Sequence, residues 1–313
     1  MPARAFRIAY DGTDYYGFQR QPDVPTVEDA LFAALRALDA YDPACDASSG
    51  PDRPAGSAAA GRTDAGVSAL AQTIALSVPD WLTPRAFNAE LPAAVRAWAA
   101  ADVPPSFHAT HDAIRREYTY HLYAPPASGN ESRDGRGVPG ADRPRQAARS
   151  SIDRPMPVTD DRFHAACGAL SGPHDFHNLT PDDDNTERSP TVEATRDGDY
   201  LVLTVTAGGF TRELVRRLVS LAHAVGTGAE SPTKIDRAFD PEPLPGHEGI
   251  PPAPPEPLVL TAVTYPDLAF TIDERGAASA RAVFERQRID RRTGARVAEQ
   301  LAAGVATDES TGR

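Results

Sequence analysis

The sequence has almost no lysine, little cysteine and no long apolar run. Lys234 is the only lysine among 313 residues, and Cys45 and Cys167 are the only cysteines. Two distant cysteines exclude a multi-cysteine zinc site and a disulfide framework. No stretch approaches the ~20 apolar residues of a membrane helix, and the N-terminus lacks the apolar run of a signal peptide. We therefore expect a cytoplasmic protein that makes no membrane contact.

Positive charge is also scarce. The chain has 44 acidic and 32 basic side chains, a net charge of −12. An acidic surface nearly free of lysine suits a protein that stays soluble in concentrated salt, where screening removes carboxylate repulsion, so halophilic adaptation is expected; the alternative is a codon bias toward Ala, Arg, Asp and Pro. Such acidity argues against nucleic acid as a partner. In molar salt, however, long-range attraction is screened for any protein, so only local arginine clusters contribute to nucleic-acid binding.

Hydrophobic alternation and turn residues predict the elements of the chain. Helices are expected from Thr26, over a short turn capped by Thr83, at about 159–170 and at 211–225. The predicted strands cover residues 6–10, 95–103, 115–124, a hairpin at 192–209 with its turn at Asp197-Gly198, and 257–265. Eight prolines exclude a helix from 240–257.

Strand–helix–strand units occur in both halves of the chain, which predicts an α+β fold with sheets covered on one side by helices. Residues 41–57 are turn-rich and polar and indicate a loop. Residues 125–157 have no periodicity and indicate a flexible insertion. The charged tail, 271–313, is expected to form a helix with a frayed end.

The stretch "AAAGRTDAGVSALAQ" places Arg62 and Asp64 among small residues. An aspartate in a glycine-containing loop commonly bonds its own backbone. The alternative is a carboxylate nucleophile or base exposed at a loop tip, with a nearby arginine holding its pKa down. Composition alone favours the first interpretation.

Other polar and aromatic side chains leave similar alternatives open. Arg212 and Arg216 are four apart on the expected helix and form either a solvated face or a partner for a distant carboxylate. Tyr118 and Tyr120 share one strand face, which indicates core packing or stacking on a planar ring. The paired histidines of "FHATH" and "HDFH" lack an accompanying Glu or Cys ligand pattern, so no metal is expected.

Five blocks in order identify a family. They are "AYDGTDYYGFQRQ", "AAGRTDAGVSALAQ", "FHATHDAIRREYTYHLY", "GFTRELVRRLVSLAHAVG" and "PLVLTAVTYP". Together, over about residues 4–268, they closely resemble the tRNA pseudouridine synthase A family. The central GRTDAGV block is the most specific, since other pseudouridine synthase families surround their aspartate with different neighbours.

The resemblance implies an isomerase that converts uridine to pseudouridine at positions 38, 39 and 40 of the tRNA anticodon stem-loop. It implies a homodimer, no cofactor and no metal. It also implies two ferredoxin-like α/β halves with antiparallel sheets around a central RNA-binding cleft. We place these halves at 1–106, with the aspartate loop, and at 107–270, with the insertion 125–157; residues 271–313 form a charged C-terminal extension.

The resemblance also assigns the site residues. Asp64 matches the catalytic aspartate, and Arg62 matches the arginine that helps hold the uridine flipped out. Tyr118 matches the tyrosine that stacks on the target base, Arg216 matches the arginine paired with the catalytic carboxylate, and Phe210 is expected to line the pocket.

The chain departs from the family pattern at three places. Ser68 replaces a common His, Phe18 replaces a frequent Trp, and Pro257 replaces the usual Gly. None of them falls on a residue assigned to the chemistry. The alternatives are a non-catalytic tRNA-binding or folding protein, and a carboxylate-dependent hydrolase, for which we find no second acidic residue.

Overall fold

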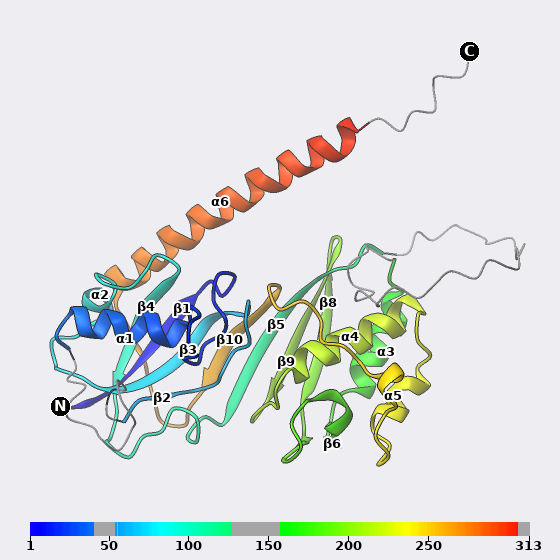
Figure 1. Cartoon of the computed structure of the whole chain (residues 1–313), viewed down its shortest axis with the longest axis horizontal. Helices are drawn as coiled ribbons and strands as arrows, with labels where there is room; N and C mark the ends of the chain where they lie inside the picture. The colour runs from blue at the N-terminus through cyan, green and yellow to red at the C-terminus, as the bar shows by residue number, and fades with distance from the viewer. Residues whose placement is uncertain (41–53, 55, 127–156, 306–313) are drawn as a thin grey trace, which may run out of the picture.

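The computed structural model describes residues 1–40, 54, 56–126 and 157–305. Its main feature is a nine-stranded sheet with helices packed against it (Figure 1). The strand order is β11-β4-β1-β3-β10-β5-β9-β8, with the short β2 paired to β3. This mixed α+β architecture confirms the expected fold class. The predicted loop 41–57 and insertion 125–157 lie mostly outside the described residues.

The N-terminal part supplies half of the sheet. Its strands are β1 (Ala3–Tyr10), β2 (Ala58–Ala59), β3 (Ser68–Ser77) and β4 (Val95–Asp102). Helix α1 (Val27–Ala37) is capped by the Thr26 hydroxyl, which accepts from the Asp29 amide. Helix α2 (Pro84–Phe87) is capped in the same way by Thr83. The strands expected at 6–10 and 95–103 and both caps are thus confirmed, whereas β2 and β3 were not predicted.

The second part contributes the remaining long strands. They are β5 (Arg115–Tyr123), β8 (Thr191–Asp197), β9 (Tyr200–Ala207) and β10 (Leu258–Thr264). Its helices are α3 (Asp160–Ala169), α4 (Leu214–Thr227) and α5 (Thr233–Ala238). Short elements are the β6–β7 pair (His174–Asp175, Glu187–Arg188), the 3-10 turns His177–Leu179 and Gly246–Glu248, and β11 (Thr271–Ile272). Among the described residues, 240–257 contain no α-helix, as expected.

One strand pair joins the two parts into a single sheet. β10 pairs antiparallel with β5 but parallel with β3, where Val259 lies opposite Ser68 and Leu260 opposite Ala69. Within each part the long strands pair antiparallel, as expected, and among the described long strands the parallel pairing is confined to this junction. The physical reason is connectivity: β10 returns after a long crossover containing α4 and α5, and such a connection permits parallel entry.

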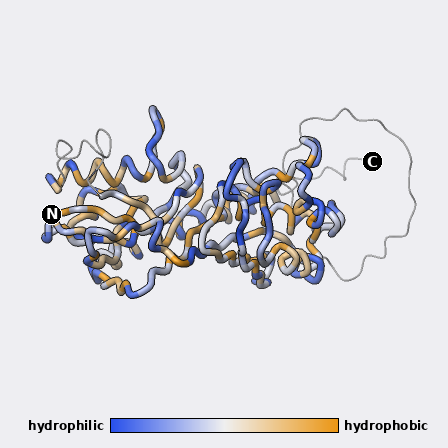
Figure 2. The backbone as a smooth tube through the Cα atoms, turned by 90° about the horizontal axis from the view of Figure 1, so that it is seen from below, coloured by the Kyte–Doolittle hydropathy of each residue, from blue (hydrophilic) through white to orange (hydrophobic). Residues whose placement is uncertain are grey.

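The helices over both parts cover the same face of the sheet. Leu258 and Leu260 are two residues apart on β10 and so point to one side. Leu258 belongs to the core packed by α3 and α4, whereas Leu260 belongs to the core packed by α1. Figure 2 shows hydrophobic segments gathered along the strands beside the N-terminus and hydrophilic ones in the outer loops.

Helix α4 begins later than the sequence pattern predicts. Its first residue is Leu214 rather than Thr211, because Glu213 has a φ of 61°, in the left-handed region that a continuing helix excludes. The predicted apolar stripe of Leu214, Leu218, Leu221 and Val225 is buried. Arg212 therefore lies in the turn before the helix, and the expectation that it shares the helix face of Arg216 is wrong.

The C-terminal extension is a single long helix. α6 (Glu274–Gly304) has 31 residues, and the Asp273 carboxylate accepts from the Gly276 amide to cap it. Its first turns bury Ala277 and Ala280, and beyond them it extends away from the sheet (Figure 1). The expected frayed end, 306–313, lies outside the described residues. No helix in the described ranges is both long and apolar enough to cross a membrane.

Candidate active site

A cavity of about 1370 Å³ opens where the Asp64 loop, strand β5 and the start of α4 meet. Its lining includes all the residues assigned from the sequence: Asp64, Arg62, Tyr118, Arg216 and Phe210. These residues come from positions 62 to 216, so only the tertiary fold brings them together. The cavity also takes in Tyr16, Gln19, Asp182 and Arg188 at a more polar margin.

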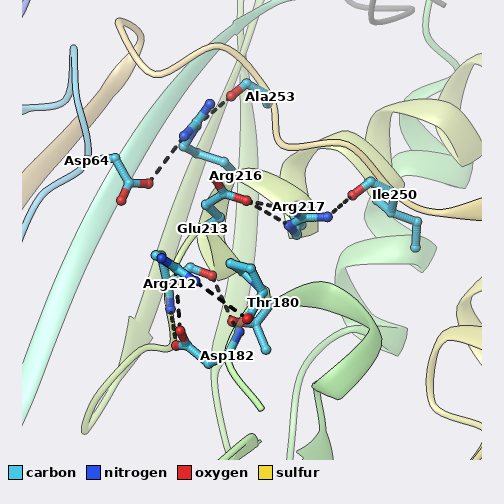
Figure 3. A network of polar contacts seen from close by, with 10 residues as sticks. Asp64, Thr180, Asp182, Arg212, Glu213, Arg216, Arg217, Ile250 and Ala253 are labelled. Carbon is cyan, nitrogen blue, oxygen red and sulfur yellow. Dashed lines mark hydrogen bonds and ion pairs between the residues drawn. The ribbon is translucent and has the colours of Figure 1, made fainter. Parts of the chain in front are cut away.

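Asp64 and Arg216 form an ion pair in this cavity. Nη1 of Arg216 donates to Oδ2 of Asp64 at 3.2 Å, and Nε of Arg216 donates to the Ala253 carbonyl at 2.6 Å (Figure 3). The Arg216 side chain is only 13% exposed and that of Asp64 29%. Arg216 is therefore not part of a solvated helix face, and Asp64 is half-buried rather than exposed at a loop tip.

The loop that carries Asp64 is fixed by its neighbours on both sides. Thr63 is buried, and its hydroxyl lies 2.7 Å from the Tyr10 hydroxyl. The Phe18 amide donates to the Thr63 carbonyl at 3.0 Å, and the Gln72 side-chain amide donates to the Gly61 carbonyl at 2.8 Å. A loop held in this way positions the Asp64 carboxylate before any substrate arrives.

Glycine is required at position 66 by the protein itself. Gly66 has a φ of 81°, which L side chains rarely adopt. A Cβ at this position would also lie 2.8 Å from Cγ of Pro255. Gly66 is therefore explained by the close approach of the proline-rich segment.

Burial raises the pKa of Asp64 above its ordinary value. Desolvation is the largest cause; the charge and hydrogen bond of Arg216 act in the opposite direction, and Glu213 adds a smaller increase. The expectation that a nearby arginine holds this pKa down is therefore wrong in its net sign. The arginine is present, but it offsets only part of the cost of burying the carboxylate.

Tyr118 lies on strand β5 and lines the same cavity as Asp64. Its ring meets Phe210 edge-on, with centroids 5.3 Å apart and an interplanar angle of 86°. Burial, with the nearby charge of Asp64 as the next cause, raises the pKa of Tyr118 to about 12, so the hydroxyl stays protonated at neutral pH. Tyr120, two residues along, is fully buried in the core. Tyr120 therefore fits the interpretation of core packing, whereas Tyr118 lines the cavity and its stacking on a planar ring stays a prediction.

The two remaining arginines lie at the cavity's polar side. Arg62 is exposed and lines the cavity. Arg212 pairs with Asp182: its amide donates to the carboxylate at 2.8 Å, and its Nε lies 3.5 Å from the other oxygen (Figure 3). Arg212 and Arg216 thus each contact a carboxylate from another loop. From the sequence, such a contact is an alternative for only one of them.

Sequence reasoning missed Arg116, which holds the cavity wall together. Arg116 is buried, and its guanidinium donates to the carbonyls of Ala60 at 2.8 Å, Thr110 at 2.6 Å and Gly208 at 2.5 Å. These carbonyls belong to the segments before Asp64, before β5 and after β9. The sequence does contain an indication of this residue: Arg116 precedes Tyr118 by two residues on the predicted strand and so lies on the same face.

The histidine pairs do not assemble a metal site with other ligands. The rings of His108 and His111 are tilted by 35° with centroids 4.1 Å apart, and the ring of His174 stacks on that of Phe239 with centroids 4.0 Å apart. Across 1–40, 54, 56–126 and 157–305, no group of three or more His, Cys, Asp or Glu side chains could hold a metal ion.

Comparison with known proteins gives consistent matches. A family model described as tRNA pseudouridine synthase matches residues 166–266, which include Phe210 and Arg216 but not Asp64. The tRNA pseudouridine synthase A of Haloarcula marismortui is 54% identical over 303 residues, covering 96% of this chain and 100% of that protein. That of Natronomonas pharaonis is 51% identical over 95% of this chain and 98% of its own.

More distant relatives carry the same name. The tRNA pseudouridine synthase A of Methanosarcina acetivorans is 32% identical over 266 residues, covering 83% of this chain and 84% of that protein. Identity at this level, extending over nearly the full length of both proteins in the nearer relatives, shows the relationship. The chain belongs to the tRNA pseudouridine synthase A family.

Proposed function

We propose that this protein converts uridine to pseudouridine in tRNA, within the anticodon stem-loop at positions 38, 39 and 40. The observation that carries the proposal is the Asp64–Arg216 ion pair at 3.2 Å inside a cavity also lined by Tyr118. Family membership supports the reaction type, and the cavity supports a substrate that must insert a whole nucleotide. The modified positions rest on the family resemblance.

The substrate uridine has to leave the stem before its glycosidic bond can be reached. Extruding a base costs a few kcal/mol of unstacking. Arg62 is exposed at the cavity and suits the role of holding the extruded nucleotide, through its phosphate or by filling the vacated place. The edge-on Tyr118 and Phe210 rings offer aromatic surface beside which the planar base is retained.

Asp64 is the group that acts on the ribose. Its carboxylate either adds to C1′, releasing uracil from N1, or takes the C2′ proton to give a glycal. In both routes the C1′–N1 bond breaks, the uracil turns, and C5 bonds to C1′. In the first route C5 displaces the Asp64 carboxylate from C1′, and in the second route C2′ takes its proton back as C5 adds to the glycal. The C5 proton is then lost and N1 gains one, so the product is an isomer of the substrate. Arg216 aims the carboxylate and stabilises its charge, while Tyr118, protonated at neutral pH, holds the detached ring.

The wider assignments follow from the same resemblance. We propose a cytoplasmic homodimer that needs no cofactor, with ferredoxin-like halves at 1–106 and 107–270 around the RNA-binding cleft. The two hydrophobic cores, one under α1 and one under α3 and α4, support a division into halves. The β3–β10 pairing would then be the junction between them.

The alternative function is a non-catalytic tRNA-binding or folding protein. Such a protein needs a surface for RNA but no carboxylate held beside an arginine in a cavity. The raised pKa and the fixed geometry of Asp64 favour the enzyme.

The test uses an in vitro transcribed tRNA with uridine in the anticodon stem-loop, incubated in KCl with the wild type or with Asp64→Ala. Pseudouridine is mapped by carbodiimide adducts and primer extension. We expect stops in the stem-loop with the wild type only, while both proteins still bind the tRNA in a filter assay.

Asp160→Ala is the matched control, because Asp160 also pairs with an arginine, Arg196, but does not line the cavity. It is expected to keep wild-type turnover. Activity of Asp64→Ala within tenfold of the wild type would contradict the assignment of Asp64. Tight tRNA binding without stops in the wild type would favour the binding-protein alternative.

A further inference from the structure

Helix α6 differs in charge from the rest of the molecule. It contains seven arginines and four acidic residues, a net charge of +3 in a chain whose total is −12. The excess is concentrated around its middle, where residues 286–296 hold five arginines and one acid. A basic segment on an otherwise acidic protein marks a surface for an anionic partner.

Four of the seven arginines of α6 are accessible and share a face. Arg281, Arg288, Arg292 and Arg296 follow one another at intervals of seven, four and four residues, which places them on one side of the helix. Every residue from 288 to 305 is exposed. Among the described residues, no carboxylate oxygen lies within 4.0 Å of Arg281, Arg292 or Arg296; Arg288 pairs with Glu285 at 2.6 Å.

A contact halfway along α6 fixes its position relative to the cavity. Nη2 of Arg291 lies 2.5 Å from Oδ2 of Asp11 and 3.3 Å from the Thr13 hydroxyl. The loop that follows Asp11 packs on the Asp64 loop, since the Gly66 amide donates to the Tyr15 carbonyl at 3.1 Å. Tyr16 of the same loop lines the cavity. Arg291 lies between Arg288 and Arg292 in the chain, so the middle of the arginine face is near the loop that borders the cavity.

We propose that the face of α6 formed by Arg281, Arg288, Arg292 and Arg296, the α6 arginine face, binds the phosphate backbone of the tRNA outside the cavity. The inference rests on the proposed function. The cavity accommodates a flipped nucleotide, whereas the rest of a tRNA extends far beyond it. A helix of 31 residues is about 46 Å long, enough to follow the backbone away from the cavity.

Arginine suits this role in a protein adapted to salt. Screening removes long-range attraction at molar ionic strength, but bidentate guanidinium–phosphate hydrogen bonds act at contact distance. The α6 arginine face would thus allow a protein with a net negative charge to bind the negatively charged tRNA.

A second copy of this chain is the competing occupant. A coiled coil requires apolar residues at two positions of every heptad. The exposed apolar residues of the second half, Ile289, Val297 and Leu301, are too sparse for such a seam. The charge and the position beside the cavity therefore favour RNA.

The test compares the wild type with a triple variant, Arg281→Gln, Arg292→Gln and Arg296→Gln, which removes the charge but keeps an unbranched polar side chain of similar helix propensity. The matched control removes three exposed arginines that do not line the cavity, through Arg36→Gln, Arg85→Gln and Arg162→Gln. Full-length tRNA binding and steady-state turnover are measured across a KCl series. We expect KM for tRNA to rise about tenfold or more with kcat unchanged, and the slope of log K against log salt to fall by about two.

An unchanged KM and salt slope, equal to those of the control, would overturn the proposal. So would a change from dimer to monomer in sedimentation velocity with tRNA affinity unaltered, because α6 would then be an interface between copies. Hydrogen exchange of the wild type gives a second measurement: tRNA is expected to slow exchange over residues 286–300, and no protection there contradicts the proposal. If the wild type binds tRNA but forms no pseudouridine, the proposed function is refuted. The comparison of tRNA binding between the wild type and the triple variant would still decide the role of α6.

Discussion

Asp64 experiences two opposed influences that decide when it is charged. Its half-buried position disfavours the carboxylate, and the contact with Arg216 favours it. Burial dominates, so the pKa is raised. A carboxylate poised in this way is more basic than an ordinary aspartate, which suits either attack on C1′ or removal of a C2′ proton.

The raised pKa of Asp64 predicts where activity is lost in acid. The proposed chemistry needs the ionised form, so kcat/KM should fall as pH decreases through a value above the 3.8 of an unperturbed aspartate. The measurement is kcat/KM against pH at constant KCl. An acid inflection at or below 3.8, with the protein still folded, would argue against Asp64 as the titrating group.

The same shift has a consequence for stability. A carboxyl whose pKa is higher in the folded state contributes most to the free energy of unfolding below its unfolded-state pKa, and this contribution is lost as pH rises through the folded-state value. Asp64→Asn does not titrate. As pH rises from the unfolded-state pKa to the folded-state pKa of Asp64, the free energy of unfolding of Asp64→Asn should therefore increase relative to that of the wild type. Above the folded-state pKa the difference should stay constant, and denaturant unfolding at a series of pH values measures it.

At the scale of elements, the site is assembled by segments without regular structure. The Asp64 loop is fixed between the loop containing Phe18 on one side and the proline-rich segment on the other, where Pro255 approaches Gly66. The same segment supplies the Ala253 carbonyl that receives Arg216. The proline-rich segment thus contributes to the site through Pro255, which lines the cavity, and through the Ala253 carbonyl, which receives Arg216.

Gly66→Ala tests this packing. A left-handed φ costs a non-glycine residue about 1–3 kcal/mol, and the added Cβ would press on Pro255. We expect a lower melting temperature and a reduced kcat because the Asp64 loop shifts.

Gly168→Ala is the control for that substitution. Gly168 lies in α3, and no heavy atom lies within 4 Å of a Cβ built there; alanine should be neutral or stabilising. Equal stability and activity of the two variants would show that the Gly66–Pro255 contact is unimportant.

At the scale of the whole molecule, acidity and salt are linked. A net charge of −12 repels itself in dilute buffer, where the Debye length is about 10 Å, and much less at 1 M salt, where it is about 3 Å. We expect the free energy of unfolding to increase from about 0.1 M to molar KCl. Sucrose at equal osmolality, which does not screen charge, is the control. A protein fully folded and active in dilute buffer that lost both in molar KCl would contradict halophilic adaptation.

The sequence by itself determined the family, most of the main strands and helices, and five of the residues that line the cavity. These follow from local patterns: the GRTDAGV block, period-two alternation, and caps such as Thr26 and Thr83. Each signal is carried by residues close in the chain, so no knowledge of distant contacts is needed to find it.

Only the tertiary structure decided the sign of the Asp64 pKa shift, the role of Arg116, the reason for Gly66 and the parallel β3–β10 pairing. Each depends on atoms that meet across dozens to hundreds of residues. Desolvation in particular is set by everything that surrounds a carboxylate, and a sequence shows its neighbours along the chain but not those in space.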